Sequence, residues 1–184
     1  MMIKTFIFTL FGSILLNSPS NSPATATDHF SISNKHVIWQ KVFETPLSKK
    51  EIIQNIRYSG HFNDITVHDG YVTAQIPMLS LDFRGYEIST ERTAPTFSRT
   101  HFIQSYLIID FKENRYRVTL KSIRLMPRQV TGDDSEMIID LEFIAINPNN
   151  GQFNQRFFNR RSKVLNHTFE QVTDFTSAVS DDDW

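Results

Sequence analysis

Residues 101–125 read HFIQSYLIIDFKENRYRVTLKSIRL, and this stretch gives the clearest structural signal in the chain. It contains two largely apolar runs, 101–112 and 115–125, which meet at Glu113-Asn114. In the second run, apolar positions alternate with hydrophilic ones. One face of the predicted strand carries Tyr116, Val118 and Leu120. The other face carries Arg117, Thr119 and Lys121. This alternation is typical of an antiparallel sheet with one buried face and one wetter face.

A short helix is predicted upstream of this hairpin, after a strand at 36–44 (HVIWQKVFE). The sequence SKKE at 48–51 is a capping box: the Ser48 hydroxyl can accept from the Glu51 amide, and the Glu51 carboxylate can reach back to the Ser48 amide. The apolar positions that follow form one stripe, Ile52, Ile53 and Ile56. Together these signals predict a helix over 48–58.

A second hairpin and a closing helix complete the predicted elements. Asp69-Gly70 is a strong turn dipeptide that divides 63–76 into two arms, and Pro77 predicts a bulge or an edge position after them. Apolar residues at helical spacing predict a last helix from about Arg160 to Ala178. Its core-facing positions include Leu165, Phe169 and Val172. The segment 136–146 is apolar but too short to assign to strand or helix.

The order of these elements is strand, helix, four strands and helix, or β-α-β-β-β-β-α. Short helices that flank a run of strands predict an α+β fold, with the helices packed on one face of a mostly antiparallel sheet. We expect one domain at 36–179, a flexible segment before it at 27–35, and an acidic tail at 180–184.

The N-terminus has the three parts of a secretory signal peptide. Lys4 gives a positive start, residues 5–16 (TFIFTLFGSILL) are apolar, and Ala24 and Ala26 are the small residues that a signal peptidase recognises. The apolar run is shorter than the roughly 20 residues that span a bilayer. We therefore expect cleavage after Ala26 and export to the periplasm or the medium, with no membrane span in the mature chain. A retained N-terminal anchor or a buried helix is the alternative.

Composition excludes several classes of protein. The 184 residues include no cysteine and have a formal net charge of −1. The lack of cysteine excludes disulfides, thiolate metal sites and a cysteine nucleophile, and an exported chain without disulfides favours a bacterial source. A near-neutral chain does not fit a nucleic-acid binder. The serine-hydrolase, zinc-protease, phosphate-loop and EF-hand motifs are all absent, so we expect a non-enzymatic protein with no cofactor.

Two parts of the sequence resemble a family of secreted Bacteroidetes proteins. They are KVFE at 41–44 with LSKKE at 47–51, and IDFKENRYRVTL at 109–120. The family is a domain of unknown function described as having a TATA-binding-protein-like fold, and the resemblance covers roughly 37–125. It implies the fold alone. It does not imply DNA binding, and it supplies no catalytic residues.

The densest polar group lies around the hairpin at 63–76 and comprises His61, Asp64, His68 and Asp69. Imidazole and carboxylate groups suit zinc, so the group could form a metal site or an acid–base pair. The alternative interpretation is an ordinary solvated strand and turn, since no known ligand motif has this spacing.

A second group of candidates lies on the late hairpin: Arg115, Arg117, Lys121 and Arg124. These cations could receive a phosphate, a carboxylate or an acidic glycan, or could contact a partner. Surface charge paired with Asp and Glu is the alternative. A further cluster stands where the last helix begins, namely Arg156, Arg160, Arg161 and Lys163. The helix dipole disfavours cations at that position, and either Asp133-Asp134 or a partner could relieve the conflict.

Three functional hypotheses follow. The leading one is an exported, non-enzymatic module that binds an unknown protein, peptide, ligand or envelope component through its sheet face or edges. The second is a metal-assisted hydrolase that uses the group from His61 to Asp69. The third is a small-ligand binder with a pocket between helix and sheet.

Overall fold

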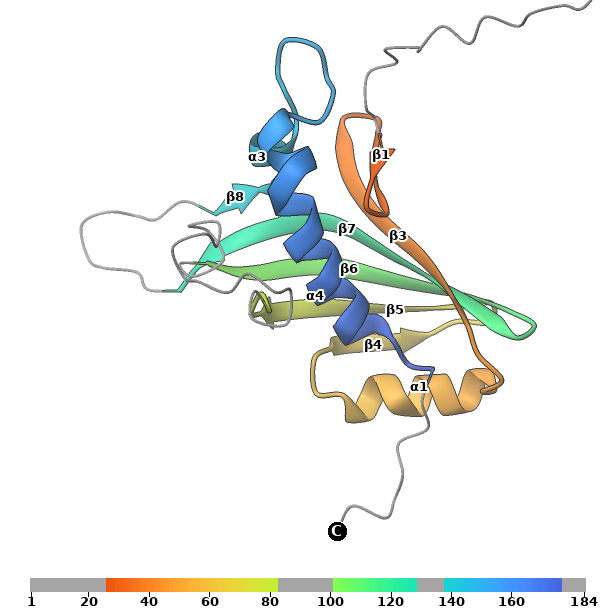
Figure 1. Ribbon diagram of the computed structural model, residues 1–184. Helices are drawn as coiled ribbons and strands as arrows, with labels where there is room; N and C mark the ends of the chain where they lie inside the picture. The colour runs from red at the N-terminus through yellow and green to blue at the C-terminus, as the bar shows by residue number, and fades with distance from the viewer. Residues whose placement is uncertain (1–25, 83–100, 129–137, 177–184) are drawn as a thin grey trace, which may run out of the picture.

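The computed structural model describes residues 26–82, 101–128 and 138–176. In this part of the chain, eight strands form one sheet in the order β1-β2-β3-β7-β6-β5-β4, with β8 beside β7 (Figure 1). All the pairings are antiparallel. The strands are β1 (Ala26–Thr27), β2 (Phe30–Ser33), β3 (His36–Glu44), β4 (Asn63–Val67), β5 (Tyr71–Leu79), β6 (His101–Lys112), β7 (Arg115–Pro127) and β8 (Ile139–Asp140). The helices are α1 (Lys49–Tyr58), α3 (Leu141–Ala145), the π-helix η1 (Phe157–Arg161) and α4 (Ser162–Thr173). The predicted α+β fold is confirmed.

The β6–β7 hairpin occupies the centre of the sheet, as its alternating pattern predicts. Tyr116, Val118 and Leu120 are buried, while Arg117 and Lys121 are exposed. Thr119 also lies on the wetter face but is buried, and its hydroxyl accepts a hydrogen bond of 2.9 Å from Gln40 of β3. The register shifts between Gln104 and Tyr106, opposite Ser122, which has a φ of 51°. The bulge keeps Ile123 and Leu125 on the buried face.

The capping box predicted at the start of α1 is present. The Ser48 amide donates to Glu51 Oε2 at 2.7 Å, and the Glu51 amide donates to Ser48 Oγ at 3.4 Å. The Ser48 hydroxyl also donates to Glu51 Oε2 at 2.7 Å, and this hydrogen bond, together with that from the Ser48 amide, lowers the pKa of the Glu51 carboxyl. Ile52 and Ile56 are buried and Ile53 is half-buried, so the apolar stripe faces the core as expected.

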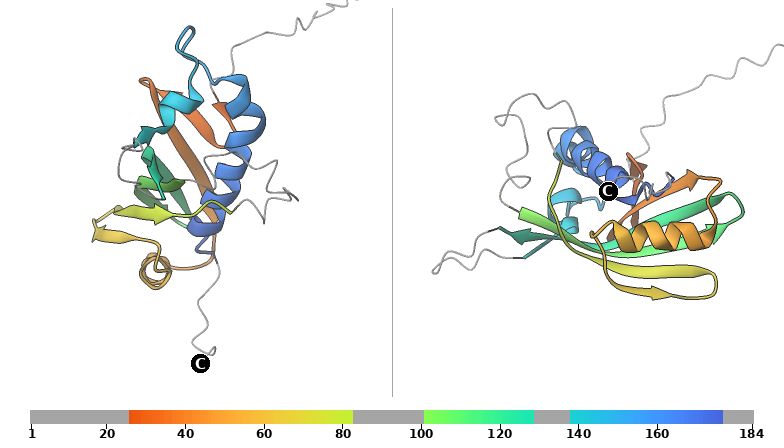
Figure 2. Two further views of the ribbon diagram at one scale, coloured as in Figure 1. Left: turned by 90° about the vertical axis from the view of Figure 1, so that its left-hand side faces the viewer. Right: turned by 90° about the horizontal axis from the view of Figure 1, so that it is seen from below.

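Aromatic side chains fill the core between α4 and the sheet. Trp39 and Phe169 meet with ring centroids 5.6 Å apart, and Phe30 meets Phe157 at 5.3 Å. All four rings are fully buried. The helices lie on one side of the sheet, where α4 crosses β7, β6 and β5 obliquely (Figures 1 and 2). The predicted packing of Leu165 and Phe169 against the sheet is confirmed.

Several predicted boundaries differ from the structure. Residues 27–35, expected to be flexible, include strand β2, and Phe30 is only 1% exposed. This segment is ordered because Phe30 packs against Phe157 and Phe169. The residues next to Phe30 in the sequence are mostly polar and give no sign of this distant contact. The ambiguous segment at 136–146 contains both strand β8 and helix α3. The closing helix ends at Thr173, before a C-cap residue with extended backbone, Asp174.

Some sequence predictions lie outside the described residues. These are the signal peptide apart from Ala26, the residues Asp133-Asp134 and the acidic tail at 180–184. Ala26 itself is the first residue of β1 and pairs with Ser31.

Candidate functional site

The face of the sheet turned away from the helices is the main surface available for binding. Figure 2 shows α1 and α4 on one side of the sheet, with no described helix on the other. Several large side chains are exposed on this open face, although they are apolar or aromatic. Val42 is 51% exposed, and Tyr71 and Tyr106 are each 40% exposed. We use the name "open face" for this outward surface of β3, β7, β6 and β5.

Strand register arranges the open face in rows. Arg117 of β7 stands between Val42 of β3 and Asp110 of β6, and Tyr71 of β5 continues this row. In the next row toward the hairpin turn, Arg115 stands between Glu44 and Lys112. Farther from the turn, Lys121 pairs with Tyr106. Cations and aromatic rings therefore share this surface.

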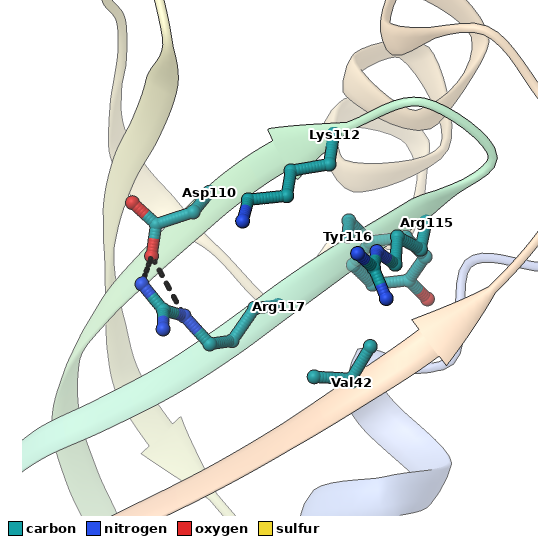
Figure 3. A pocket seen from close by; sticks show the side chains of 6 residues that line it. All are labelled: Val42, Asp110, Lys112, Arg115, Tyr116 and Arg117. Atoms are coloured by element: carbon teal, nitrogen blue, oxygen red, sulfur yellow. Dashed lines mark hydrogen bonds and ion pairs between the residues drawn. The ribbon is translucent and has the colours of Figure 1, made fainter.

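A shallow hollow of about 210 Å³ lies on the open face near the β6–β7 turn. Its lining comprises Val42, Asp110, Lys112, Arg115, Tyr116 and Arg117 (Figure 3). Arg117 donates to Asp110 Oδ2 from Nε at 3.1 Å and from Nη2 at 2.9 Å. An exposed pair of this kind contributes little to stability, but it orients the Arg117 guanidinium beside the hollow.

The cations around the hollow outnumber the acids available to them. Among the described residues, no ion pair involves Lys112 or Arg115, although Glu44 lies opposite Arg115 in the register. Asp110 is already engaged by Arg117. Lys112 and Arg115 can therefore supply charge-assisted hydrogen bonds to a carboxylate or phosphate group of a ligand.

The four cations predicted on this hairpin do not form one site. Arg115 and Arg117 line the same hollow, and Lys121 lies on the same face outside it. Arg124 lies toward the far end of β7 and pairs with Asp140 at 3.1 Å. Sequence reasoning missed Lys112, which the two-residue turn at 113–114 places directly opposite Arg115. The short turn was the signal that could have found it.

The group of His61, Asp64, His68 and Asp69 is not assembled as a metal site. No three His, Asp or Glu side chains in the described ranges stand close enough together to hold a metal ion. The His68 ring instead stacks on Tyr71 with centroids 4.2 Å apart, and its Nε2 lies 3.4 Å from Thr73 Oγ1. The structure therefore gives no support to the metal-assisted hydrolase.

Large side chains of the described residues fill the space between helix α4 and the sheet. Trp39 and Tyr116 are fully buried there, and Phe30 and Phe169 contact each other with centroids 6.1 Å apart. The Trp39 indole N–H donates to Asn166 Oδ1 at 2.9 Å, so the polar group of this ring is also satisfied from α4. A core packed in this way disfavours the small-ligand hypothesis.

Within the described segments, none of the helices has both the length and the apolar character that crossing a membrane requires.

Comparisons with known proteins give matches in structure only. No family model matches the chain, and no curated protein sequence matches it. A TBP-like protein from Parabacteroides distasonis matches with a TM-score of 0.46 and 17% identity, over 80% of this chain and 97% of the other. A DUF4468 family protein from Bacteroides ovatus matches with a TM-score of 0.47 and 13% identity, over 83% of this chain and 93% of the other. Two structural neighbours of the chain are thus a TBP-like protein and a domain-of-unknown-function protein from Bacteroidetes species.

Proposed function

We propose that the protein is an exported, non-enzymatic module that binds a protein, a peptide or an envelope component on the open face of its sheet. The observation that supports this most directly is the composition of that face. Exposed Val42, Tyr71 and Tyr106 stand beside Arg115 and other cations on a surface that no described helix covers.

The chemistry of the open face indicates what the partner offers. Tyrosine and arginine are the side chains that most often dominate the binding energy of protein interfaces. Tyr106 stands beside Lys121, and Arg115 stands beside Lys112, so both kinds of group are available at neighbouring positions. A partner segment with carboxylate or phosphate groups next to apolar side chains would complement this pattern.

A capture experiment with matched variants tests the role of the open face. The wild-type protein, immobilised and exposed to envelope extract, should retain a defined partner. Tyr106→Ala and Arg115→Ala should each retain at least tenfold less of it, since central interface residues of these types often contribute more than about 1.4 kcal/mol.

The matched controls are Tyr58→Ala and Arg57→Ala on α1, on the helix side of the sheet. Both side chains are exposed, so neither change should alter folding or capture. Equal loss of the partner in all four variants, or no loss from the two open-face changes, would refute the proposed surface.

Export is tested separately from binding. Expressed with its own N-terminus, the protein should be recovered outside the cytoplasm with Thr27 as its first residue, because Ala24 and Ala26 provide the small residues for cleavage. Intact-mass spectrometry of the recovered protein decides the question. A mass that includes residues 1–26 would mean that the apolar segment is kept as an anchor.

A further inference from the structure

Helices α3 and η1 meet at the end of the domain away from the β6–β7 turn (Figure 1). A hollow of about 350 Å³ lies between them, separate from the open face. Its lining comprises Phe143, Ile144, Asn154, Gln155, Arg156 and Arg161. None of these described lining residues is acidic, and we call this surface the α3–η1 patch.

The most conspicuous apolar group of the patch is Phe143. It is 84% exposed, more than any other large hydrophobic side chain in the described part of the chain. Ile144 lies beside it, half-buried, on the same short helix. An exposed phenylalanine of this kind has a large apolar area to remove from water, so it favours contact with a second apolar phase.

The basic part of the patch is held in position by local hydrogen bonds. Arg161 donates from Nη1 to the Ile144 carbonyl at 3.2 Å, which fixes its guanidinium beside the hollow. Asn154 supports the same carbonyl from Nδ2 at 2.7 Å, and its Oδ1 accepts from the Phe157 amide at 2.8 Å. Partial burial and the neighbouring Arg156 lower the pKa of Arg161, so an anion bound between the two arginines would relieve their repulsion.

Charge along this part of the chain is strongly one-sided. From Phe143 to Phe169 the sequence contains no Asp or Glu, although it contains four cations, Arg156, Arg160, Arg161 and Lys163. Three of these are exposed, and their spacing along η1 and α4 places Arg156, Arg160 and Lys163 on one side of the helix. The π-helical turn between them is a feature that often marks functional sites.

We propose that the α3–η1 patch docks on the surface of a bilayer that contains anionic phospholipids. Phe143 enters the boundary between headgroups and acyl chains, while Arg156 and Arg161 hold a lipid phosphate in the hollow and the neighbouring cations face other headgroups. Cations combined with an exposed aromatic side chain are the usual composition of such interfacial surfaces.

Vesicle co-sedimentation tests this proposal, which does not depend on the function of the open face. The protein used is the form recovered from cells, with the N-terminus that the mass measurement defines. It should bind vesicles of equal parts phosphatidylglycerol and phosphatidylcholine, and bind vesicles of phosphatidylcholine alone much more weakly. Binding should weaken as the salt concentration rises, because screening reduces the attraction between the cations and the headgroups.

Two variants should reduce binding to the anionic vesicles. Phe143→Ala removes the inserted ring and should lower the partition coefficient by about tenfold or more. Arg156→Glu reverses a charge at the hollow and should lower it by a similar factor on anionic vesicles, with little change on neutral ones. Both residues are exposed, and chemical unfolding checks that the two variants remain as stable as the wild type.

The controls are Tyr58→Ala and Arg57→Glu on α1, where an exposed aromatic residue and cations also stand together. They match the two test variants in kind but lie on another surface, and should bind vesicles as the wild type does. The proposal is overturned if the wild type does not bind anionic vesicles, or if Phe143→Ala and Arg156→Glu bind them as well as the wild type does. It is also overturned if the two α1 variants lose as much binding as these two variants.

Discussion

Phe169→Ala should destabilise the protein by about 3–5 kcal/mol, because the ring is fully buried and its removal leaves a cavity that the core cannot close. Phe169 contacts Trp39 and Phe30, so one truncation loosens α4 from two strands of the sheet. Chemical unfolding followed by circular dichroism measures the loss.

Arg117→Ala is the comparison for this variant. Arg117 points to the opposite face of the same sheet and makes only an exposed ion pair with Asp110, so its removal should change the free energy of unfolding by no more than about 0.5 kcal/mol in the absence of a partner. If Arg117→Ala were the more damaging change, the assignment of buried and open faces would be wrong.

Tyr116→Phe should also destabilise the fold, because the lost hydroxyl serves two backbone groups at once. Tyr116 Oη donates to the Thr173 carbonyl at 3.0 Å and accepts from the Phe175 amide at 2.7 Å. Both partners are buried, and leaving buried polar groups without partners costs about 1–3 kcal/mol each. The expected result is a fall in the free energy of unfolding of at least about 1 kcal/mol, with the end of α4 exchanging its amide hydrogens faster.

The pH dependence of this variant provides a second test. Burial raises the pKa of Tyr116 well above its ordinary value of 10.0. A group whose pKa is raised by folding stabilises the protein fully below its unfolded pKa, and this contribution declines as the pH rises beyond it. The difference in stability between wild type and Tyr116→Phe should therefore narrow above about pH 10. A constant difference across that range would show that the hydroxyl is not buried as described.

Local signals allowed the best predictions of the fold. The capping box of α1 and the Asp69-Gly70 turn depend on residues close in sequence, and both are present. The bulge predicted from Pro77 is also present, as a register shift between Ile76 and Leu79. Strand β2 was missed because its order depends on Phe157 and Phe169, which lie more than a hundred residues away. No propensity in FSIS reports such a contact.

The candidate site was only partly predictable for the same reason. The two-residue turn sets the register of β6 against β7, so the meeting of Lys112 with Arg115 could be derived from the sequence. The positions of Val42 and Tyr71 depend on β3 and β5 flanking this hairpin, which follows from the order of strands in the sheet. The hollow beside Phe143 was still harder to predict from the sequence. The helices that form it are a five-residue helix and a π-helix, and neither gives a clear hydrophobic periodicity.

The closure of the core over β2 and β3 has a consequence for the time course of folding. The aromatic contacts of Phe30 and Trp39 come from α4 and η1, and the hydrogen bond from Trp39 to Asn166 spans 127 residues. During synthesis β2 can pair with β3, and β3 with β7, but their buried faces lack the aromatic cover of η1 and α4 until nearly the whole chain is available. Contacts between such distant segments slow folding. The apolar faces of β2 and β3 thus stay exposed to solvent until α4 has been synthesised. A truncation that removes α4 should leave a chain with no stable folded state.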